Sequence, residues 1–199
     1  MSKIRAAITA VEGYLPDYVL TNEELSQMMD TSDEWIMTRI GIRERRMLKE
    51  EGKATSDMAA IAVQNLLKNN NIAPEEIDGV ICCTVTPDMH FPATASIVAD
   101  KCGIHGGMSM DMNVGCSGFI YGLKTASLYV ESGFCKKLLL IGAEKMTSAI
   151  DYQDRATAPI FGDGAAVVLL EPTEEEVGVM DAILCSDGVG RKHLHMKAG

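Results

Sequence analysis

The chain has 199 residues, 47% apolar and 23% charged, which excludes a disordered tail, a collagen-like fibre and a coiled coil. Its net charge of −10 would repel phosphate backbones and anionic lipids, so nucleic acids and membranes are poor partners. The longest apolar run, residues 165–170, is far shorter than the ~18 residues that span a bilayer. The opening residues lack the apolar segment of a secretory signal, and the six cysteines lack a framework spacing. We therefore expect a cytoplasmic protein with reduced thiols.

The first half of the chain alternates between strand and helix patterns. Residues 4–12 read as a strand, and two capping-box patterns, 21–24 and 31–34, each predict the start of a short helix. Gly41 is expected to end the second helix. A longer helix is predicted over residues 55–68, because apolar residues recur there at helical spacing: Met58, Ala59, Ala62, Val63, Leu66 and Leu67.

The remaining elements continue this alternation. The sequence predicts a short helical turn at 74–77 and helices over 94–102 and 116–132. Strands are predicted over 79–86, 109–113, 137–143, 165–170 and 177–184. Strands that alternate with helices indicate an α/β fold with a largely parallel sheet.

The predicted helix over residues 116–132 has no polar face. Its only charged residues, Lys124 and Glu131, are seven apart and therefore lie on the same side. A helix of this kind is buried on most of its circumference, so we expect it to lie between two sheets. The predicted strands are enough for one sheet, and the second must come from elsewhere.

Cys116 lies where a strand, a tight turn and a helix start meet, between Gly115 and Gly118. The glycines allow a sharp bend and the close approach of a substrate. Free N–H groups of the first helical turn would favour the thiolate and could hold a developing oxyanion. The alternative is that Cys116 is a small buried apolar residue, which is the usual role of a free cysteine.

Three segments of the chain resemble the signature segments of β-ketoacyl-acyl-carrier-protein synthase III. They are residues 30–45 (DTSDEWIMTRIGIRER), residues 113–119 (NVGCSGF), and Asp154–Arg155 leading to residues 161–165 (FGDGA). The resemblance covers nearly the whole chain in order. It implies the thiolase-like fold, an α/β architecture with αβαβα layers. Residues 1–199 would be the N-terminal half and the start of the second half, with the Cys116 helix in the central layer.

The resemblance also implies the roles of single residues in binding acyl-coenzyme A. Cys116 matches the nucleophile that takes the acyl group. Trp35 and Arg155 match the residues on either side of the adenine, Thr31 matches a residue that touches it, and Arg39 matches one that pairs with phosphate. These residue types suit the ligand, because flat rings stack on a base and guanidinium groups bind phosphate bidentately.

The resemblance further implies an acyl pocket and a reaction. Phe91 matches a phenylalanine that reaches across a homodimer interface into the partner's pocket, and Met146, Ile160 and Phe161 fall near the pocket wall. The reaction is the start of fatty-acid synthesis, a decarboxylating Claisen condensation. A short acyl-CoA acylates the cysteine, and malonyl-acyl carrier protein then attacks the acyl-cysteine. The coenzyme A thioester is a substrate, and no cofactor or metal is expected.

The family's catalytic histidine and asparagine lie in the second half, outside these 199 residues. Asn113, His193 and His195 do not match those motifs. We therefore expect that the chain can be acylated but cannot condense, and that it either belongs to a longer product or pairs with another half. Two alternatives remain: a related thiolase-fold synthase acting on acyl-CoA in lipid or secondary metabolism, and a non-catalytic half-fold used for binding.

Four arginines form the densest basic cluster of this acidic chain: Arg39, Arg43, Arg45 and Arg46. We expect this cluster to meet coenzyme phosphates and to offset the repulsion of an acidic carrier protein. The alternative is a solvated helix end with Glu44 as its ionic partner.

Cysteine, methionine and histidine patterns elsewhere have simpler interpretations. The adjacent Cys82 and Cys83 should point to opposite faces of a strand and fill the core. Three alternating methionines beside the cysteine turn are interpreted first as core and second as acyl pocket: Met108, Met110 and Met112. The two histidines near residue 194 indicate a surface segment rather than a metal site.

Overall fold

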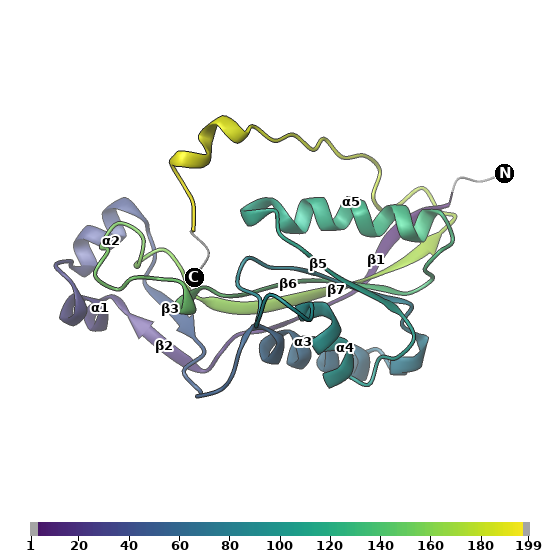
Figure 1. Cartoon of the computed structure of the whole chain (residues 1–199), viewed down its shortest axis with the longest axis horizontal. Coiled ribbons are helices and arrows are strands. Elements are labelled where there is room, and N and C mark those ends of the chain that lie inside the picture. The colour runs from purple at the N-terminus through teal and green to yellow at the C-terminus, as the bar shows by residue number, and fades with distance from the viewer. Residues whose placement is uncertain (1–3, 197–199) are drawn as a thin grey trace.

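The computed structural model describes residues 4–196, and Figure 1 shows its elements. In chain order these are β1 (Arg5–Tyr14), β2 (Tyr18–Thr21), α1 (Asn22–Met28), α2 (Asp33–Arg39), β3 (Glu44–Met47), α3 (Thr55–Asn69), η1 (Pro74–Glu76), β4 (Gly79–Cys83), α4 (Thr94–Lys101), β5 (Met108–Met112), η2 (Gly115–Ser117), α5 (Gly118–Glu131), β6 (Leu138–Lys145), η3 (Met146–Ser148), β7 (Asp163–Thr173) and η4 (Gly188–Lys192).

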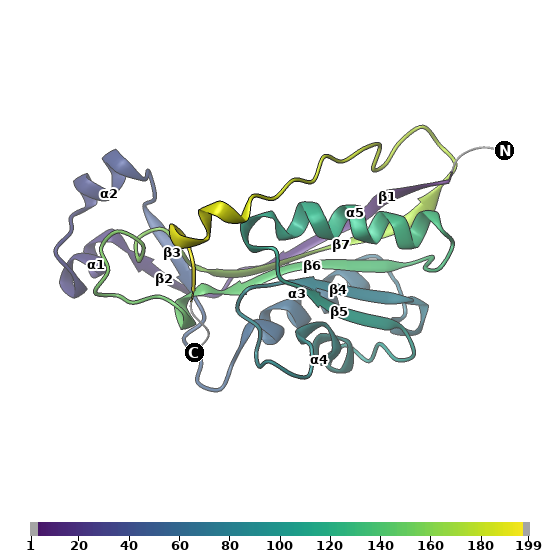
Figure 2. The ribbon, with the colours of Figure 1, turned by 45° about the horizontal axis from the view of Figure 1, so that its top comes forward.

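The main sheet has five strands in the order β1-β7-β6-β4-β5 (Figure 2). Strand β4 pairs in parallel with β5 and β6, but β7 is antiparallel to both β6 and β1. The expectation of a largely parallel sheet is therefore wrong for one side of it. The physical reason is the connection: residues 146–162 between β6 and β7 contain no crossover helix, which a parallel pair would need.

Helices cover both faces of this sheet. Helices α3 and α4 lie on one face and α5 lies on the other (Figure 1). The predicted apolar face of α3 is confirmed, since all six of its named residues are buried. Cys82 belongs to the core beneath α3 and Cys83 to the core beneath α5, because successive strand residues point to opposite faces.

Helix α5 lies very close to the sheet through two glycines one turn apart. A Cβ atom on Gly122 would sit 2.6 Å from Cys83 Sγ and 2.7 Å from Leu140 Cδ1, and one on Gly118 would sit 3.1 Å from Cys83 Cβ. The opposite face of α5 exposes apolar side chains, among them Phe119, Ile120 and Leu128. Burial around most of the helix is thus not seen within residues 4–196, because the five-stranded sheet covers only one face of α5.

The C-terminal segment, residues 174–196, runs over α5 in an extended path (Figure 1). The strand predicted over residues 177–184 is wrong: Val179 N–H donates to the Ala6 carbonyl at 2.8 Å, but no strand forms and Ile183 is 88% exposed. The Tyr121 hydroxyl donates to the Cys185 carbonyl at 3.0 Å, which joins this segment to α5.

The two short helices and the β2–β3 pair form an extension at one end of the sheet (Figure 1). The cap of α1 is confirmed, because Thr21 Oγ1 accepts from Glu24 N–H at 3.2 Å. The cap of α2 is one residue later than predicted: Ser32 Oγ, not Thr31, accepts from Trp35 N–H at 3.1 Å. Within residues 4–196, none of the helices is both long enough and apolar enough to cross a membrane.

Candidate functional site

The predicted site residues lie mainly on loops at one edge of the sheet. Strands β4, β5 and β6 are mutually parallel, so the loops that follow them all leave from their carboxyl ends. These loops are residues 84–93 with Phe91, residues 113–117 with Cys116, and residues 146–162 with Arg155. The carboxyl edge of an open α/β sheet is the usual place for a ligand site.

Cys116 lies in η2, directly before α5. The turn before it depends on Gly115, whose φ of +57° is in the left-handed region that favours glycine. The Gly118 N–H donates to the Gly115 carbonyl, but no side-chain hydrogen bond from Ser117 caps the start of α5, which leaves N–H groups of its first turn for a ligand. Cys116 is free and exposed, and the alternative of a buried apolar cysteine is wrong.

The other cysteines differ from Cys116 in their surroundings. Burial raises the pKa of Cys83 and of Cys102 to about 11, and it raises the pKa of Cys82 and Cys135 as well. These four thiols remain protonated at neutral pH and are shielded from reagents. Of the cysteines in residues 4–196, only Cys116 and Cys185 are exposed.

Three of the four residues predicted to bind coenzyme A meet around one indole ring. Arg155 Cζ lies 4.6 Å and Arg39 Cζ 4.9 Å from the centre of the Trp35 ring. Arg155 Nη1 also lies 3.2 Å from a carboxylate oxygen of Asp30. The Thr31 hydroxyl, one residue further on, is buried without a hydrogen-bond partner. The chain thus brings a flat aromatic surface and two cations together, as recognition of a nucleotide requires.

The predicted acyl-pocket residues share the carboxyl edge but are dispersed along it. Phe91 is 87% exposed at the tip of its loop, and the Phe91–Pro92 peptide bond is cis. Met146 begins η3, directly after β6. Ile160 and Phe161 lie near the end of the 146–162 loop, and Ile160 is exposed. Their role in an acyl pocket stays a prediction.

Sequence reasoning missed the carboxylates that hold these loops. Strand β4 ends at Cys83, earlier than predicted. The Thr84 N–H still donates to the Met112 carbonyl of β5 at 3.2 Å, but the next two N–H groups bond to the side chain of Glu144 on β6 instead of to a strand. Glu144 accepts from the N–H groups of Val85 and Thr86 at 2.8 and 3.1 Å and from the Thr84 hydroxyl at 3.2 Å. The sequence did contain a signal: Glu144 is an acidic residue at the end of an apolar run, and a carboxylate in such a place needs several hydrogen-bond donors around it.

Asp163 closes the base of the 146–162 loop. Its carboxylate accepts from Thr147 N–H at 2.9 Å, from the Thr147 hydroxyl at 2.7 Å and from Leu48 N–H at 2.8 Å. Asp163 is only 5% exposed, so water cannot take the place of its carboxylate as the acceptor for these three donors. Asp163 is also the first residue of β7, so the strand begins directly after Gly162.

We expect Asp163→Asn to lower the free energy of unfolding by about 2–3 kcal/mol, because an amide cannot accept from all three donors and buried donors are costly to leave unpaired. Urea denaturation of the 199-residue chain measures this. Asp17→Asn, at an exposed position, is the matched control and should change stability by less than about 0.5 kcal/mol. Equal midpoints for the two variants would contradict the role assigned to Asp163.

The basic cluster of four arginines is not a single surface. Arg39 and Arg43 are exposed, but Arg45 is 4% exposed and points into the protein, so it cannot face coenzyme phosphates. Burial lowers the pKa of the Arg45 guanidinium. Arg46 Nη1 donates to the Pro16 carbonyl at 3.2 Å and Arg46 Nη2 lies 4.0 Å from Glu44, which supports the alternative pairing for that residue.

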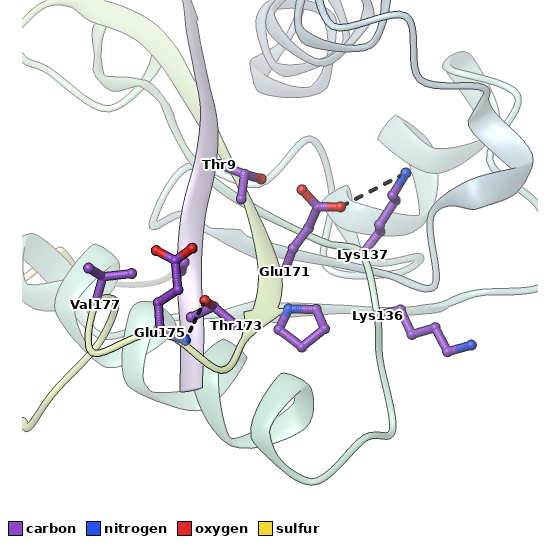
Figure 3. Close-up of a pocket in the computed structure, with 9 residues that line it drawn as sticks. Thr9, Lys136, Lys137, Glu171, Thr173, Glu175 and Val177 are labelled. Atoms are coloured by element: carbon purple, nitrogen blue, oxygen red, sulfur yellow. Dashed lines mark hydrogen bonds and ion pairs between the residues drawn. The ribbon is translucent and has the colours of Figure 1, made fainter. Parts of the chain in front are cut away.

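A hollow of about 560 Å³ lies at the opposite edge of the sheet, between the ends of β1 and β7 (Figure 3). Its floor carries Lys137, which lies 2.6 Å from Glu76 and 3.9 Å from Glu171. None of the predicted site residues lines it. Lys137 is already paired with two carboxylates, and the hollow lies at the other edge of the sheet from Cys116. We therefore treat it as separate from the predicted site.

Comparison with known proteins agrees with this geometry. Residues 110–188 match the family model for 3-oxoacyl-[acyl-carrier-protein] synthase III. The whole chain is 55% identical to beta-ketoacyl-[acyl-carrier-protein] synthase III 2 of Bacteroides thetaiotaomicron and to the synthase III of Phocaeicola vulgatus. Over its whole length the chain is therefore similar to β-ketoacyl-[acyl-carrier-protein] synthase III proteins. It spans 59% and 60% of the length of these two relatives.

A solved structure confirms the fold of the chain. The synthase III of Thermus thermophilus superimposes with a TM-score of 0.90 at 42% identity, over 95% of this chain and 58% of that one. The layers seen here, α3 and α4, the sheet and then α5, are therefore those of a thiolase-fold enzyme. The expected fold class is confirmed.

Proposed function

We propose that the chain is the acyl-accepting part of a β-ketoacyl-acyl-carrier-protein synthase III, which starts fatty-acid synthesis. The observation that carries the proposal is the exposed Cys116 at the start of α5, which no side chain caps, on the same sheet edge as the loop of Arg155. The similarity to synthase III proteins supports the same reaction. The substrate of the first step is a short acyl-CoA, and no cofactor beyond that thioester takes part.

The first step is transfer of the acyl group to Cys116. The thiolate attacks the thioester carbonyl, a new C–S bond forms, and the bond to coenzyme A breaks. The coenzyme leaves as a thiolate and takes up a proton. N–H groups at the start of α5 stabilise both the attacking thiolate and the oxyanion of the tetrahedral intermediate. Gly115 leaves open space at the turn, because a Cβ atom at that position would meet nothing within 4 Å, whereas Gly118 lets the helix lie close to Cys83 in the sheet.

The second step is condensation in the complete enzyme. Malonyl-acyl carrier protein loses carbon dioxide, and its carbanion attacks the carbonyl carbon of the acyl-cysteine. The C–S bond breaks and Cys116 is released as a thiolate, while β-ketoacyl-acyl carrier protein departs. Covalent capture in step one predicts ping-pong kinetics for the pair of substrates.

The proposal includes a homodimer and a cytoplasmic location. Phe91, exposed at the tip of its loop, would enter the acyl pocket of the partner subunit. Thiols that are all free within residues 4–196 are in keeping with a reducing compartment. The acidic charge of the chain argues against nucleic-acid and membrane partners.

Trp35→Ala is expected to weaken coenzyme A binding by about tenfold, because stacking of a base on an aromatic ring is worth ~1–3 kcal/mol. Isothermal titration calorimetry measures the affinity of both proteins. The chain holds one tryptophan, so quenching of the wild-type fluorescence by coenzyme A gives a second reading of the same site.

Phe134→Ala is the matched control for Trp35, since it removes another exposed aromatic ring, one that follows α5 and packs against Tyr129. It should leave coenzyme A affinity unchanged. Equal affinities for Trp35→Ala and the wild type would remove Trp35 from the binding site. Tight binding by the wild type without any transfer of its acyl group would favour the non-catalytic half-fold.

A further inference from the structure

Arg45 is a buried cation whose acceptors are all neutral. Its Nε donates to the Pro159 carbonyl at 2.8 Å, and its Nη1 donates to Asn22 Oδ1 at 2.7 Å and reaches the Leu20 carbonyl at 3.5 Å. Its Nη2 is buried without a partner. Burying a cation without a carboxylate partner costs free energy, so the stability of the fold is a poor reason for an arginine at this position. The places of its hydrogen-bond acceptors in the structure give a better reason.

Pro159 belongs to the 146–162 loop, which also carries Arg155. The loop touches the β2–β3 pair again at Gly162, where a Cβ atom would lie 3.0 Å from the Arg46 carbonyl and 3.2 Å from Arg45 Cβ. With Asp163 at the base, the loop is held at its base and along its returning arm. Arg155 lies between these anchors and faces the Trp35 ring.

Asn22 connects Arg45 by hydrogen bonds to α2, the helix on the other side of the same site. It is 2% exposed, and its Nδ2 donates to Asp33 Oδ1 at 2.7 Å and to the Ile42 carbonyl at 2.9 Å. Asp33 is the first residue of α2, the helix that carries Trp35 two residues later. A continuous chain of hydrogen bonds therefore runs from the loop of Arg155 to the helix of Trp35; it is buried at Arg45 and Asn22 and ends at the exposed Asp33.

We propose that Arg45 is a positioning residue that, through Pro159 and Asn22, fixes the separation between Arg155 and Trp35 in the nucleotide site. The rigid, planar guanidinium sets two donor directions at once, which a lysine cannot do. Arg45 touches no substrate in this arrangement. The inference rests on the proposed function. Arg155 Cζ lies 4.6 Å from the centre of the Trp35 ring, which is direct contact, so the adenine of an acyl-CoA would enter between the two side chains as the Arg155 side chain moves off the ring.

The test compares two acyl donors on the 199-residue chain. Acetyl-CoA carries the nucleotide, and acetyl-pantetheine carries the same thioester without it. For Arg45→Lys, the acetyl-CoA concentration that half-saturates acetylation of Cys116 should rise about tenfold, as expected for a small misplacement of a binding group. The maximal rate should stay the same, because Cys116 is held by α5. Acetylation by acetyl-pantetheine should not change.

Arg191→Lys, the same exchange at an exposed position of η4, is the matched control and should behave as the wild type with both donors. Should Arg45→Lys fold poorly, Asn22→Ser breaks the same chain of bonds at a neutral residue and should give the same split. Equal losses with both donors, or no loss with either, would overturn the positioning role. Failure of the wild type to be acetylated by acetyl-CoA would instead overturn the proposed function.

Discussion

Cys116→Ala is expected to abolish acetylation of the chain by acetyl-CoA, whereas Cys185→Ala leaves it intact. Both sulfurs are free and exposed. Only Cys116 lies at a helix start whose N–H groups can stabilise a thiolate and an oxyanion, while Cys185 lies in the extended C-terminal segment. Intact-mass spectrometry after incubation should show one acetyl group on the wild type and none on Cys116→Ala.

The four buried cysteines serve as internal controls. Their pKa values are raised by burial, so at pH 7 they should stay unmodified in the folded chain. An acetyl group that persists in Cys116→Ala would place the chemistry elsewhere. An acetyl group that is lost in Cys185→Ala but kept in Cys116→Ala would mean that the C-terminal segment, and not the turn at Gly115, provides the reactive site.

The local parts of the fold were predictable because each depends on nearby residues. The apolar spacing in α3 gives its buried face, and Thr21 gives the cap of α1. Gly41, with a φ of +77°, follows directly after the last turn of α2, as a glycine terminator should. The absent polar face of α5 predicted burial on most of its circumference, but within residues 4–196 only the side that faces the sheet is buried.

The parts that could not be predicted depend on partners far apart in sequence. Arg45 looked like one member of a surface cluster, but its acceptors include a carbonyl 114 residues away. Asp163 binds Leu48 N–H across 115 residues, and no periodicity marks such a pair. The direction of β7 was missed for a related reason, because β-branched apolar runs look alike in parallel and antiparallel strands.

The candidate site was predictable in part, and by a different route. Spacing alone located Cys116 at a turn before a helix, and the structure has this arrangement. The meeting of Trp35 with Arg155 has no local signature, because 120 residues separate them, and it was expected only from the family resemblance. Glu144 was missed by both routes, although it organises the loop of Phe91.

Gly122→Ala is expected to destabilise the chain by about 1–3 kcal/mol, the range for overfilling a packed core. Alanine has the better helix propensity by ~0.8–1 kcal/mol, which favours the substitution. The contacts outweigh this gain, since the new Cβ would sit 2.6 Å from Cys83 Sγ and 2.7 Å from Leu140 Cδ1, and both residues are buried in the sheet. Urea denaturation followed by circular dichroism gives the difference.

Gly142→Ala is the matched control, because a Cβ at that position on β6 meets nothing within 4 Å. It should be neutral or slightly stabilising. Cys83→Ala should reduce the cost of Gly122→Ala, because it removes the nearer of the two contacts. An unchanged cost in that background would mean that Leu140 alone sets the distance of α5 from the sheet. A stabilising Gly122→Ala would mean that α5 can move away from β4, and the turn that presents Cys116 would then not be fixed by the sheet.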